Sequence, residues 1–159
     1  MSGAQRSKKI EAAWDNVGTL LADGLDAMLL EDWNEVESDT DQIPYNPDWD
    51  RAFALERQGI LKVLSARRAG LLIGVNCFMV MDYFHSRGVL HAFNDLIYVA
   101  PHYRGIAGPM LVRHAERLLA PMGVRRIFYS AKVKTPKTGA FFEAMGYYRF
   151  EKVFAKVMK

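Results

Sequence analysis

The chain has 159 residues, half of them hydrophobic, and a formal net charge of +3 at pH 7. This length and composition exclude a fibrous or intrinsically disordered protein and predict one domain over residues 1–159. One cysteine and four histidines without paired spacing predict no metal site, and the lack of a long apolar run or signal peptide predicts a cytoplasmic protein.

The N-terminal segment fits two periodicities. Residues 15–21 are compatible with a first strand or with the end of a helix that begins near Lys9. An amphipathic segment from residue 23 or 24 to about 37 predicts the next helix. Asn46 followed by Pro47 is a helix-start signal, so a short helix is expected through Leu55.

Strands dominate the next part of the chain. Residues 60–66 and 71–81 are rich in β-branched and apolar residues, and they flank a turn sequence at 67–70, which predicts a hairpin. Residues 85–88 form a second turn signal, followed by a strand over 89–100. Three successive antiparallel strands are therefore predicted.

Helices and strands alternate in the C-terminal third. Pro109 is predicted to lie just inside the start of a helix that ends at residues 121–123. A strand over 125–133, a short helix over 139–145 and a last strand over 147–158 are expected to follow. Together the elements predict an α/β fold with a mixed sheet.

Charge is distributed unevenly along the chain. Ten acids and no Lys or Arg lie between residues 23 and 50, whereas residues 101–159 hold twelve Lys or Arg and three Glu. The two regions are either solvated faces of opposite sign, or a basic half for an anionic cofactor and an acidic half for a cationic acceptor. Nucleic-acid binding ranks lowest, because the acidic stretch would repel phosphate and aromatic residues do not interleave the basic ones.

Residues 96–111 combine a strand, a Gly-rich turn and a helix start. Backbone N–H groups at such a turn and the helix dipole suit a pyrophosphate. Gly105 and Gly108 would allow the required backbone conformation and close approach. Glycines between a strand and a helix also form simple turns, so both interpretations stay open.

The same segment resembles the GNAT superfamily of acyl-CoA N-acyltransferases. Residues 105–107 followed by Leu111 match the second half of its central Gln/Arg-x-x-Gly-x-Gly/Ala motif, while His102 occupies the Gln/Arg position. Residues 139–147 resemble the closing signature of the family. The resemblance implies a mostly antiparallel central sheet flanked by about four helices. More narrowly, residues 44–49, 59–64 and 94–99 are similar to GNAT proteins of tailed bacteriophages.

The resemblance implies that acetyl-CoA is the acyl donor. The backbone at Ile97, Tyr98 and Val99 would pair with the pantetheine arm like an added strand. Thr135 stands where many members carry a CoA-contacting Asn. The pyrophosphate would lie against a loop in which Arg104 supplies the missing cation; that loop consists of His102, Tyr103, Arg104, Gly105, Ile106, Ala107 and Gly108.

Asp95 is the first candidate for the general base. A carboxylate on an otherwise apolar central strand is costly to bury unless it has a role or a partner, and a purely structural partner is an equal alternative. His91 lies at even spacing from Asp95 and would project from the same face, so the two could form a pair or a water relay, whereas a lone histidine on a strand more often only packs. Glu35, in the acidic region, is the third candidate.

No residue is assigned as the general acid. Many members use a tyrosine in the aromatic pair that precedes the last helix turn, but this chain has Phe141 and Phe142 there. Tyr129, Tyr147 and Tyr148 are nearby in sequence and could substitute.

The sequence thus predicts an N-acetyltransferase that transfers an acetyl group from acetyl-CoA to a primary amine by direct attack in a ternary complex. The alternative is a catalytically silent module with the same fold that binds CoA or a host protein. The amine acceptor is a small molecule or a protein, and no membrane partner is expected. The oligomeric state is open between a monomer and a homodimer.

Overall fold

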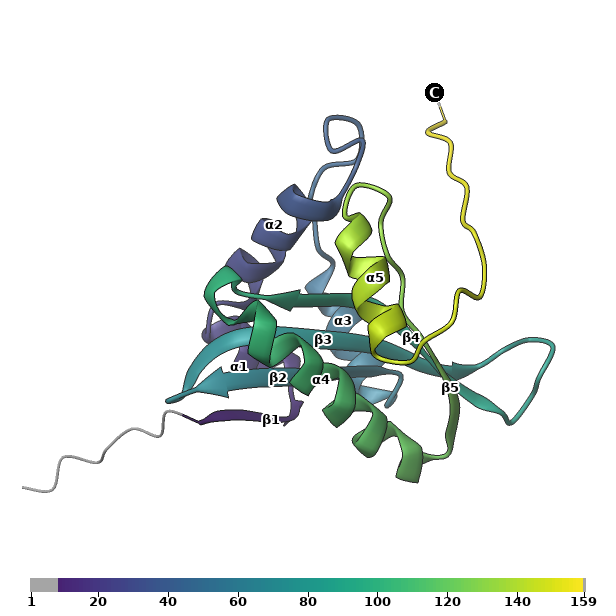
Figure 1. Ribbon diagram of the computed structural model, residues 1–159, viewed down its shortest axis with the longest axis horizontal. Helices are drawn as coiled ribbons and strands as arrows, with labels where there is room; N and C mark the ends of the chain where they lie inside the picture. Colours follow the sequence, from purple (N-terminus) through teal and green to yellow (C-terminus); the bar gives the residue numbers. More distant parts are fainter. Residues whose placement is uncertain (1–8, 159) are drawn as a thin grey trace, which may run out of the picture.

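The computed structural model describes residues 9–158, with a five-stranded sheet at its centre (Figure 1). The strands lie in sequence order, β1-β2-β3-β4-β5. Neighbours from β1 to β4 are antiparallel, and β5 runs parallel to β4. The strands are β1 (Ile10–Asp15), β2 (Leu61–Arg68), β3 (Leu71–Asp82), β4 (Leu90–Val99) and β5 (Val124–Phe128). The predicted α/β fold with a mixed, mostly antiparallel sheet is confirmed.

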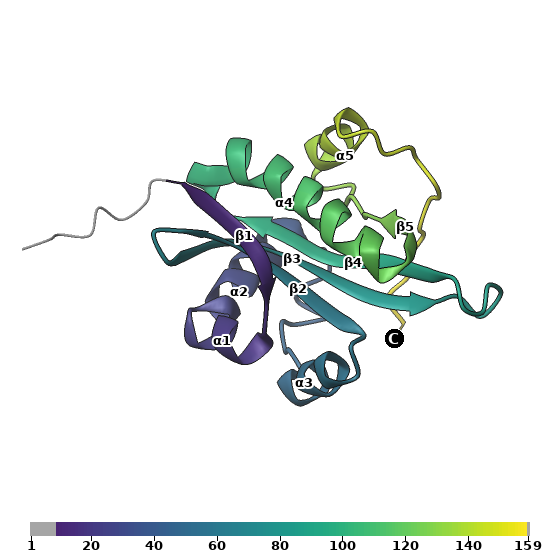
Figure 2. The ribbon, with the colours of Figure 1, turned by 90° about the horizontal axis from the view of Figure 1, so that it is seen from below.

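Helices cover both faces of the sheet (Figure 2). Helices α4 and α5 lie over one face, and α1, α2 and α3 lie over the other. The helices are α1 (Val17–Ala22), α2 (Leu25–Val36), α3 (Trp49–Arg57), α4 (Arg104–Leu119) and α5 (Pro136–Ala144), and the 3₁₀ turns η1 (Pro101–Tyr103) and η2 (Ala120–Met122) flank α4. Among the described residues, no helix combines the length and apolar character needed to cross a membrane.

Each face of the sheet has its own apolar cluster. Phe78 of β3 packs beneath α4 with Leu111, whereas Val75 of the same strand packs toward α1, as side-chain alternation requires. Gly74 lies where β3, β4 and α4 meet, and a Cβ atom there would be 2.9 Å from the Tyr98 carbonyl oxygen. β2 and β3, which have a strand on each side and apolar clusters on both faces, form the frame that positions β4.

The N-terminal segment follows neither of the two expected patterns. β1 pairs with β2 as far as Asp15, and α1 begins at Val17. Asn16 separates them, because its side-chain oxygen accepts the Thr19 N–H at 2.8 Å and so caps the helix. The helices expected over residues 23–37 and through Leu55 are confirmed as α2 and α3, although Asp48 rather than Asn46 caps α3.

Three expected boundaries in the C-terminal third are wrong. Helix α4 already begins at Arg104, because η1 leads directly into it, so Pro109 lies inside the helix. Strand β5 ends at Phe128 instead of reaching residue 133. Residues 147–158 form no strand. Their β-branched and aromatic residues favour an extended chain, but a strand also needs a hydrogen-bonded neighbour, which this segment lacks within the described residues.

Candidate active site

Strands β4 and β5 diverge halfway along β4. Their parallel register ends at the pair Phe93–Phe128, while β4 continues to Val99. Among the described residues, this part of β4 (residues 94–99) is therefore bordered by β3 on one side and by no strand on the other. Unpaired backbone of this kind must be satisfied by solvent, side chains or a ligand. An extended ligand can bind there as an added strand.

The open side of β4 presents the backbone of Ile97 and Val99. The Ala100 N–H donates to a carbonyl of β3 at 2.9 Å, so the alternation of an antiparallel ladder turns the backbone groups of Ile97 and Val99 outward. The Val99 carbonyl indeed accepts from the Nε of Arg104 on that side, at 2.9 Å. By the same alternation, the backbone of Tyr98 faces β3. Of the three strand residues expected to pair with a ligand, two are oriented to do so.

A β-bulge in β4 presents Asp95. Cys77 pairs with Leu96 and Phe78 pairs with Asn94, which leaves Asp95 as the extra residue. The Asn94 side-chain amide donates to the Leu96 carbonyl at 2.8 Å and thereby stabilises the irregular ladder. The bulge therefore has its own internal support and presents the neighbouring carboxylate at the point where the two strands separate.

Asp95 is accessible to solvent, although protein atoms surround part of its carboxylate. Burial raises its pKa, Lys132 opposes the shift, and Glu37 adds to it. Among the described residues, Asp95 has no hydrogen bond or ion pair of its own. The alternative expectation, that an arginine or the backbone binds this carboxylate for a purely structural reason, is therefore not met. A carboxylate with a raised pKa and no partner has the properties of a proton acceptor.

Asp32 of α2 is a second such carboxylate, and sequence reasoning missed it. Burial, followed by the nearby charges of Glu35 and Glu37, raises its pKa to about 6, against the opposing effect of Lys132. Because Lys132 and Glu37 also act on Asp95, the two carboxyl groups share one electrostatic environment. Asp32 follows Met28 by four residues on the apolar stripe of its helix, and this placement was the available signal.

Ion pairs connect α2 and its C-cap residue to the two segments that border the opening, which are the start of α4 and the loop after β5. Arg104 forms a bidentate pair with Glu35, at 2.8 and 2.6 Å. Lys132, in the loop after β5, pairs with Glu37 at 2.6 Å, and Lys134 donates to the Glu37 carbonyl at 3.0 Å. The acidic and basic halves of the sequence thus meet at this opening.

These contacts change two sequence expectations. Glu35, the third base candidate, has both carboxylate oxygens bound by Arg104. Arg104, expected to supply a cation to the phosphate loop, points instead toward α2, where its guanidinium also lies 5.6 Å from the Tyr98 ring. Neither side chain is available for its expected role without breaking this ion pair.

The N-terminus of α4 is open to a ligand. Its N-cap residue, Tyr103, makes no side-chain capping hydrogen bond. Ile106 is exposed, whereas Ala107 and Gly108 are buried beneath it. Gly105 does not have a positive φ, so the expected conformational requirement is wrong, but a Cβ atom there would meet nothing within 4 Å. The absence of a side chain at Gly105 instead leaves space for a phosphate to approach the N–H groups at the start of α4.

Tyr129 lies just after β5 on the α5 side of the opening. The Asn94 amide donates to the Asn76 side-chain oxygen at 2.8 Å, and the Asn76 amide donates to the Tyr129 hydroxyl oxygen at 2.9 Å. The Tyr129 proton has no acceptor among the described residues, and burial raises the pKa of this phenol, so it stays protonated at neutral pH. Tyr147 differs, because its hydroxyl donates to Glu116 at 2.9 Å.

His91 is not brought together with Asp95. Its ring packs among aromatic side chains, 4.9 Å from the Tyr83 centroid and 5.9 Å from the Phe128 centroid, and its Nε2 lies 3.3 Å from the Ser86 hydroxyl. Asp95 is four residues further along the strand, about 13 Å at the usual rise. Even spacing placed the two residues on one face, but the distance is too large for the expected pair.

The two remaining predicted residues border the opening. His102 lies exposed in η1, and Thr135 occupies the N-cap position of α5 without making a capping hydrogen bond. The Cβ position of Gly108 in α4 is 3.8 Å from the Phe141 ring of α5, so the two helices adjoin. In the part of the chain that the structure describes, no three potential metal-binding side chains come together.

Comparison with known proteins places this geometry in context. The model of the acetyltransferase (GNAT) family matches residues 24–147, which is most of the chain. A search of the curated proteins finds no match.

Several solved structures share the fold. An aminoglycoside acetyltransferase from an uncultured soil metagenomic sample is 18% identical with a TM-score of 0.73, over 95% of this chain and 99% of that chain. A ribosomal-protein-alanine N-acetyltransferase from Brucella melitensis biovar Abortus 2308 is 16% identical with a TM-score of 0.67, over 94% and 99%. AAC(6')-Iy in complex with a CoA bisubstrate analog is 18% identical with a TM-score of 0.63, over 95% and 99%.

Proposed function

We propose that this chain, which belongs to the GNAT family of acetyltransferases, transfers an acetyl group from acetyl-CoA to a primary amine by direct attack in a ternary complex. The observation that carries the proposal is the divergence of β4 from β5 beside two carboxylates, Asp95 and Asp32, whose pKa values are raised. An open strand edge suits the extended arm of an acyl donor, and basic carboxylates suit an amine that must lose a proton.

The acyl donor would bind along the open side of β4 and at the N-terminus of α4. The backbone of Ile97 and the N–H of Val99 are the groups available to an extended amide chain, since Arg104 already holds the Val99 carbonyl. Gly105 offers the space for a phosphate group to reach the uncapped helix end, where the dipole favours negative charge. His102 and Thr135 border this path and could contact the donor from either side.

Acyl transfer requires three proton and charge movements. Asp95, supported by Asp32, would accept a proton from the ammonium group, and the neutral nitrogen would attack the thioester carbonyl carbon. An outward N–H of the open strand edge, such as that of Ile97, would stabilise the negative charge that develops on the carbonyl oxygen. As the C–S bond breaks, the Tyr129 hydroxyl would donate its proton to the departing sulfur, and the positively charged nitrogen would release its extra proton, which restores the phenol directly or through water. The products are an amide and a thiol.

The acceptor we propose is a cationic amine. The α2 side of the opening carries Glu31, Asp32, Glu35 and Glu37. Lys132 and Arg104 each pair with one of these acids, and the remaining negative charge favours positively charged molecules. Structural similarity to aminoglycoside acetyltransferases supports a polyamine-like small molecule, and similarity to a ribosomal-protein N-acetyltransferase makes a protein N-terminus the next class to test. The narrower resemblance to phage GNAT proteins stays a prediction.

The second candidate function is a catalytically silent module that binds CoA or a host protein. It is favoured by the Phe141–Phe142 pair, which carries no hydroxyl where many family members have a tyrosine. Tyr129 argues against it, because its hydroxyl is held by Asn76 and its proton has no acceptor among the described residues, so it could serve as a proton donor.

One experiment separates the two functions. Thiol release from acetyl-CoA would be measured with a panel of aminoglycosides, polyamines and peptides with a free N-terminus, and the products would be identified by mass spectrometry. We expect amine-dependent thiol release and a mass increase of one acetyl group on the acceptor. Binding of acetyl-CoA, detected as a rise in thermal midpoint, without release for any amine would support the silent module. No binding at all would contradict the enzymatic function and the CoA-binding form of the silent module, and would leave only a module that binds a host protein.

A further inference from the structure

The loop after β5 carries a primary amine at the border of the opening. Beyond Phe128, where β5 ends, the chain continues through Tyr129 and reaches Lys132. This loop lies beside the C-terminal end of α2 (Figure 1), and the Lys132 Nζ is 2.6 Å from the carboxylate of Glu37, the C-cap residue of that helix. A lysine of the chain itself is therefore held next to the proposed site of acyl transfer.

The charge of Lys132 reaches both carboxyl groups of the opening. It opposes the rise in the pKa of Asp32 and of Asp95, so its amine lies within electrostatic range of each. Asp95 has no hydrogen bond or ion pair among the described residues, and Glu37 holds the ammonium group instead. The amine is thus near the proposed base without being bound to it.

The Lys132 side chain is free enough to leave Glu37. Half of it is accessible to solvent, and the ion pair with Glu37 lies at the surface. Exposed ion pairs contribute little free energy, so they break and form again readily. A lysine also carries its amine on a flexible four-carbon stem. Loss of one weak contact therefore allows the amine to turn toward Asp95.

Lys134, two residues further along the loop, has different partners. Its Nζ donates to the backbone carbonyl oxygens of Asn34, at 3.4 Å, and of Glu37, at 3.0 Å. These contacts hold it at the C-terminal end of α2, where the helix dipole favours a positive charge. One loop thus presents two amines, of which Lys132 faces carboxylates and Lys134 faces backbone carbonyls.

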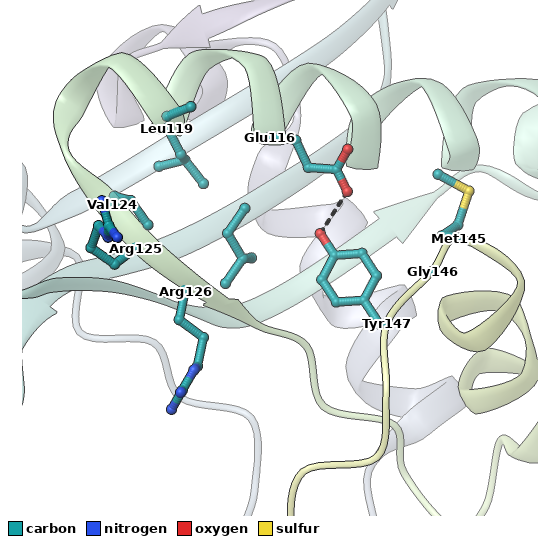
Figure 3. A pocket seen from close by; sticks show the side chains of 10 residues that line it. Glu116, Leu119, Val124, Arg125, Arg126, Met145, Gly146 and Tyr147 are labelled. Atoms are coloured by element: carbon teal, nitrogen blue, oxygen red, sulfur yellow. Dashed lines mark hydrogen bonds between the residues drawn. The ribbon is translucent and has the colours of Figure 1, made fainter.

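The same loop supplies a proton donor. Tyr129, three residues before Lys132, has a phenolic proton without an acceptor among the described residues. The neighbouring Tyr147 is engaged elsewhere, because its hydroxyl donates to Glu116 and both residues line a cavity of about 310 Å³ between α4, β5 and the turn after α5 (Figure 3). A base, an amine and a proton donor are therefore present at the opening before any acceptor molecule binds.

We propose that Lys132 is a self-acetylation site, at which the chain transfers the acetyl group of bound acetyl-CoA to its own Lys132 Nζ when no other amine is present. This inference rests on the proposed function. Asp95 accepts a proton from the Lys132 ammonium group, and the neutral nitrogen attacks the thioester carbonyl carbon. The C–S bond breaks, and the sulfur leaves with the bonding electrons and takes a proton from Tyr129. The nitrogen then releases its extra proton, which restores the phenol.

The products are Nε-acetyllysine and the thiol of CoA, and Asp95 returns its proton to solvent. The acetyl group removes the positive charge of Lys132 and with it the ion pair to Glu37. An amide nitrogen is no longer a nucleophile, so the reaction stops after one acetyl group on each chain. The modified opening carries one positive charge fewer beside Asp32 and Asp95.

The test incubates the full-length chain with acetyl-CoA alone and maps acetylated peptides by mass spectrometry before and after. We expect one added acetyl group, at Lys132, with a rate constant that does not depend on protein concentration, because donor and acceptor are held by one molecule. Asp95→Asn should slow this reaction on the order of 100-fold. Lys134→Arg is the control and should leave the rate at Lys132 unchanged.

A chemical reagent separates access from catalysis. Acetic anhydride needs no binding site, so it should label Lys132 equally in the wild type and in Asp95→Asn. An acetyl group already present on Lys132 of the purified wild type, but absent from purified Asp95→Asn, would also support the proposal.

Three outcomes would overturn the proposal. The first is a chain that binds acetyl-CoA but leaves Lys132 unmodified. The second is acetylation of Lys132 no faster than that of Lys134, which would indicate unassisted reaction of exposed lysines. The third is an equal rate at Lys132 in Asp95→Asn and the wild type. A chain that acetylates an added amine but not Lys132 keeps the proposed function and loses only the self-acetylation site, whereas a chain that does not bind acetyl-CoA loses both.

Discussion

Among the described residues, the end of β4 and the outer edge of β5 are both unpaired backbone, but different side chains surround them. Asp32, Asp95 and Lys132 border the first, and aromatic rings and arginines border the second. Ionisable groups with raised pKa values suit a reacting ligand, whereas an apolar border suits a packed contact with other protein groups. Unpaired backbone therefore marks a place for binding, and the neighbouring side chains indicate what binds.

The largest effect is expected at the β4 opening. Asp95→Asn keeps the shape of the side chain and removes the basic oxygen, so acetyl transfer should fall by roughly 10²–10⁴. Acetyl-CoA affinity should be nearly unchanged, and the thermal midpoint should not fall, because Asp95 has no structural partner among the described residues and burial opposes its ionisation. Rate, affinity and unfolding would be measured on one preparation, with Glu151→Gln near the C-terminus as the control. Normal turnover of the Asp95→Asn enzyme would show that this carboxylate is not the base.

Substitutions at two glycines should have different effects, on ligand binding at the opening and on stability in the packed frame. Gly105→Val fills open space at the end of α4 and should weaken CoA binding by about tenfold or more, or roughly 1.4 kcal/mol, while the protein stays folded. Gly74→Ala instead forces a Cβ atom toward the Tyr98 carbonyl and should destabilise the protein by about 1–3 kcal/mol. Calorimetric titration and thermal unfolding of both variants measure the contrast. Unchanged CoA affinity in a folded Gly105→Val protein would remove this helix end from the binding site.

The sequence predicted the frame better than the openings. The alternation of β2, β3 and β4 and their turns are local patterns, and Asp95 was found because it interrupts one of them. The Asp32–Asp95 environment and the Arg104–Glu35 pair depend on α2 meeting β4 and α4, which are far apart in sequence. Residues 147–158 illustrate the same limit, since they favour a strand but do not specify a neighbour.

A smaller effect should distinguish two neighbouring tyrosines, Tyr129 and Tyr147, whose ring centroids lie 5.2 Å apart. Tyr129→Phe removes a phenolic proton that has no acceptor among the described residues. We expect kcat to fall by about tenfold, less than the roughly 10²–10⁴ typical of general acid–base loss because a thiolate can leave without a proton, with little change in CoA affinity. Tyr147→Phe removes a hydroxyl that donates to Glu116, and kcat should stay the same. Steady-state kinetics with a good acceptor provide the measurement. Equal rates for both variants and the wild type would mean that the thiolate leaves without help from Tyr129.

The smallest expected effects are changes in folding stability of opposite sign. They compare Asp32, a carboxylate of the opening, with Asp15, a carboxylate of the frame. Burial and like charges raise the pKa of Asp32 to about 6, so the folded state binds its proton more tightly than the unfolded state does. The cost of ionising it is fully present above pH 6 and disappears as the pH falls toward the ordinary value of about 3.9. Asp32→Asn should therefore stabilise the protein at neutral pH, by about 1 kcal/mol after solvent screening, and this gain should vanish in acid.

Asp15 should behave in the opposite way. Burial opposes its ionisation, but hydrogen bonds from Arg67, the Asn16 N–H and Ser65 hold the pKa of Asp15 below its ordinary value. Its contribution to stability is present above about pH 3.9 and is lost as the pH falls through the lower, folded-state pKa. Asp15→Asn should thus destabilise the protein at neutral pH. Urea unfolding of both variants from neutral pH to pH 4 tests the pair of signs. A loss of stability in Asp32→Asn at neutral pH would mean that Asp32 is a structural partner, as Asp15 is, and that the opening is not held ready for proton transfer.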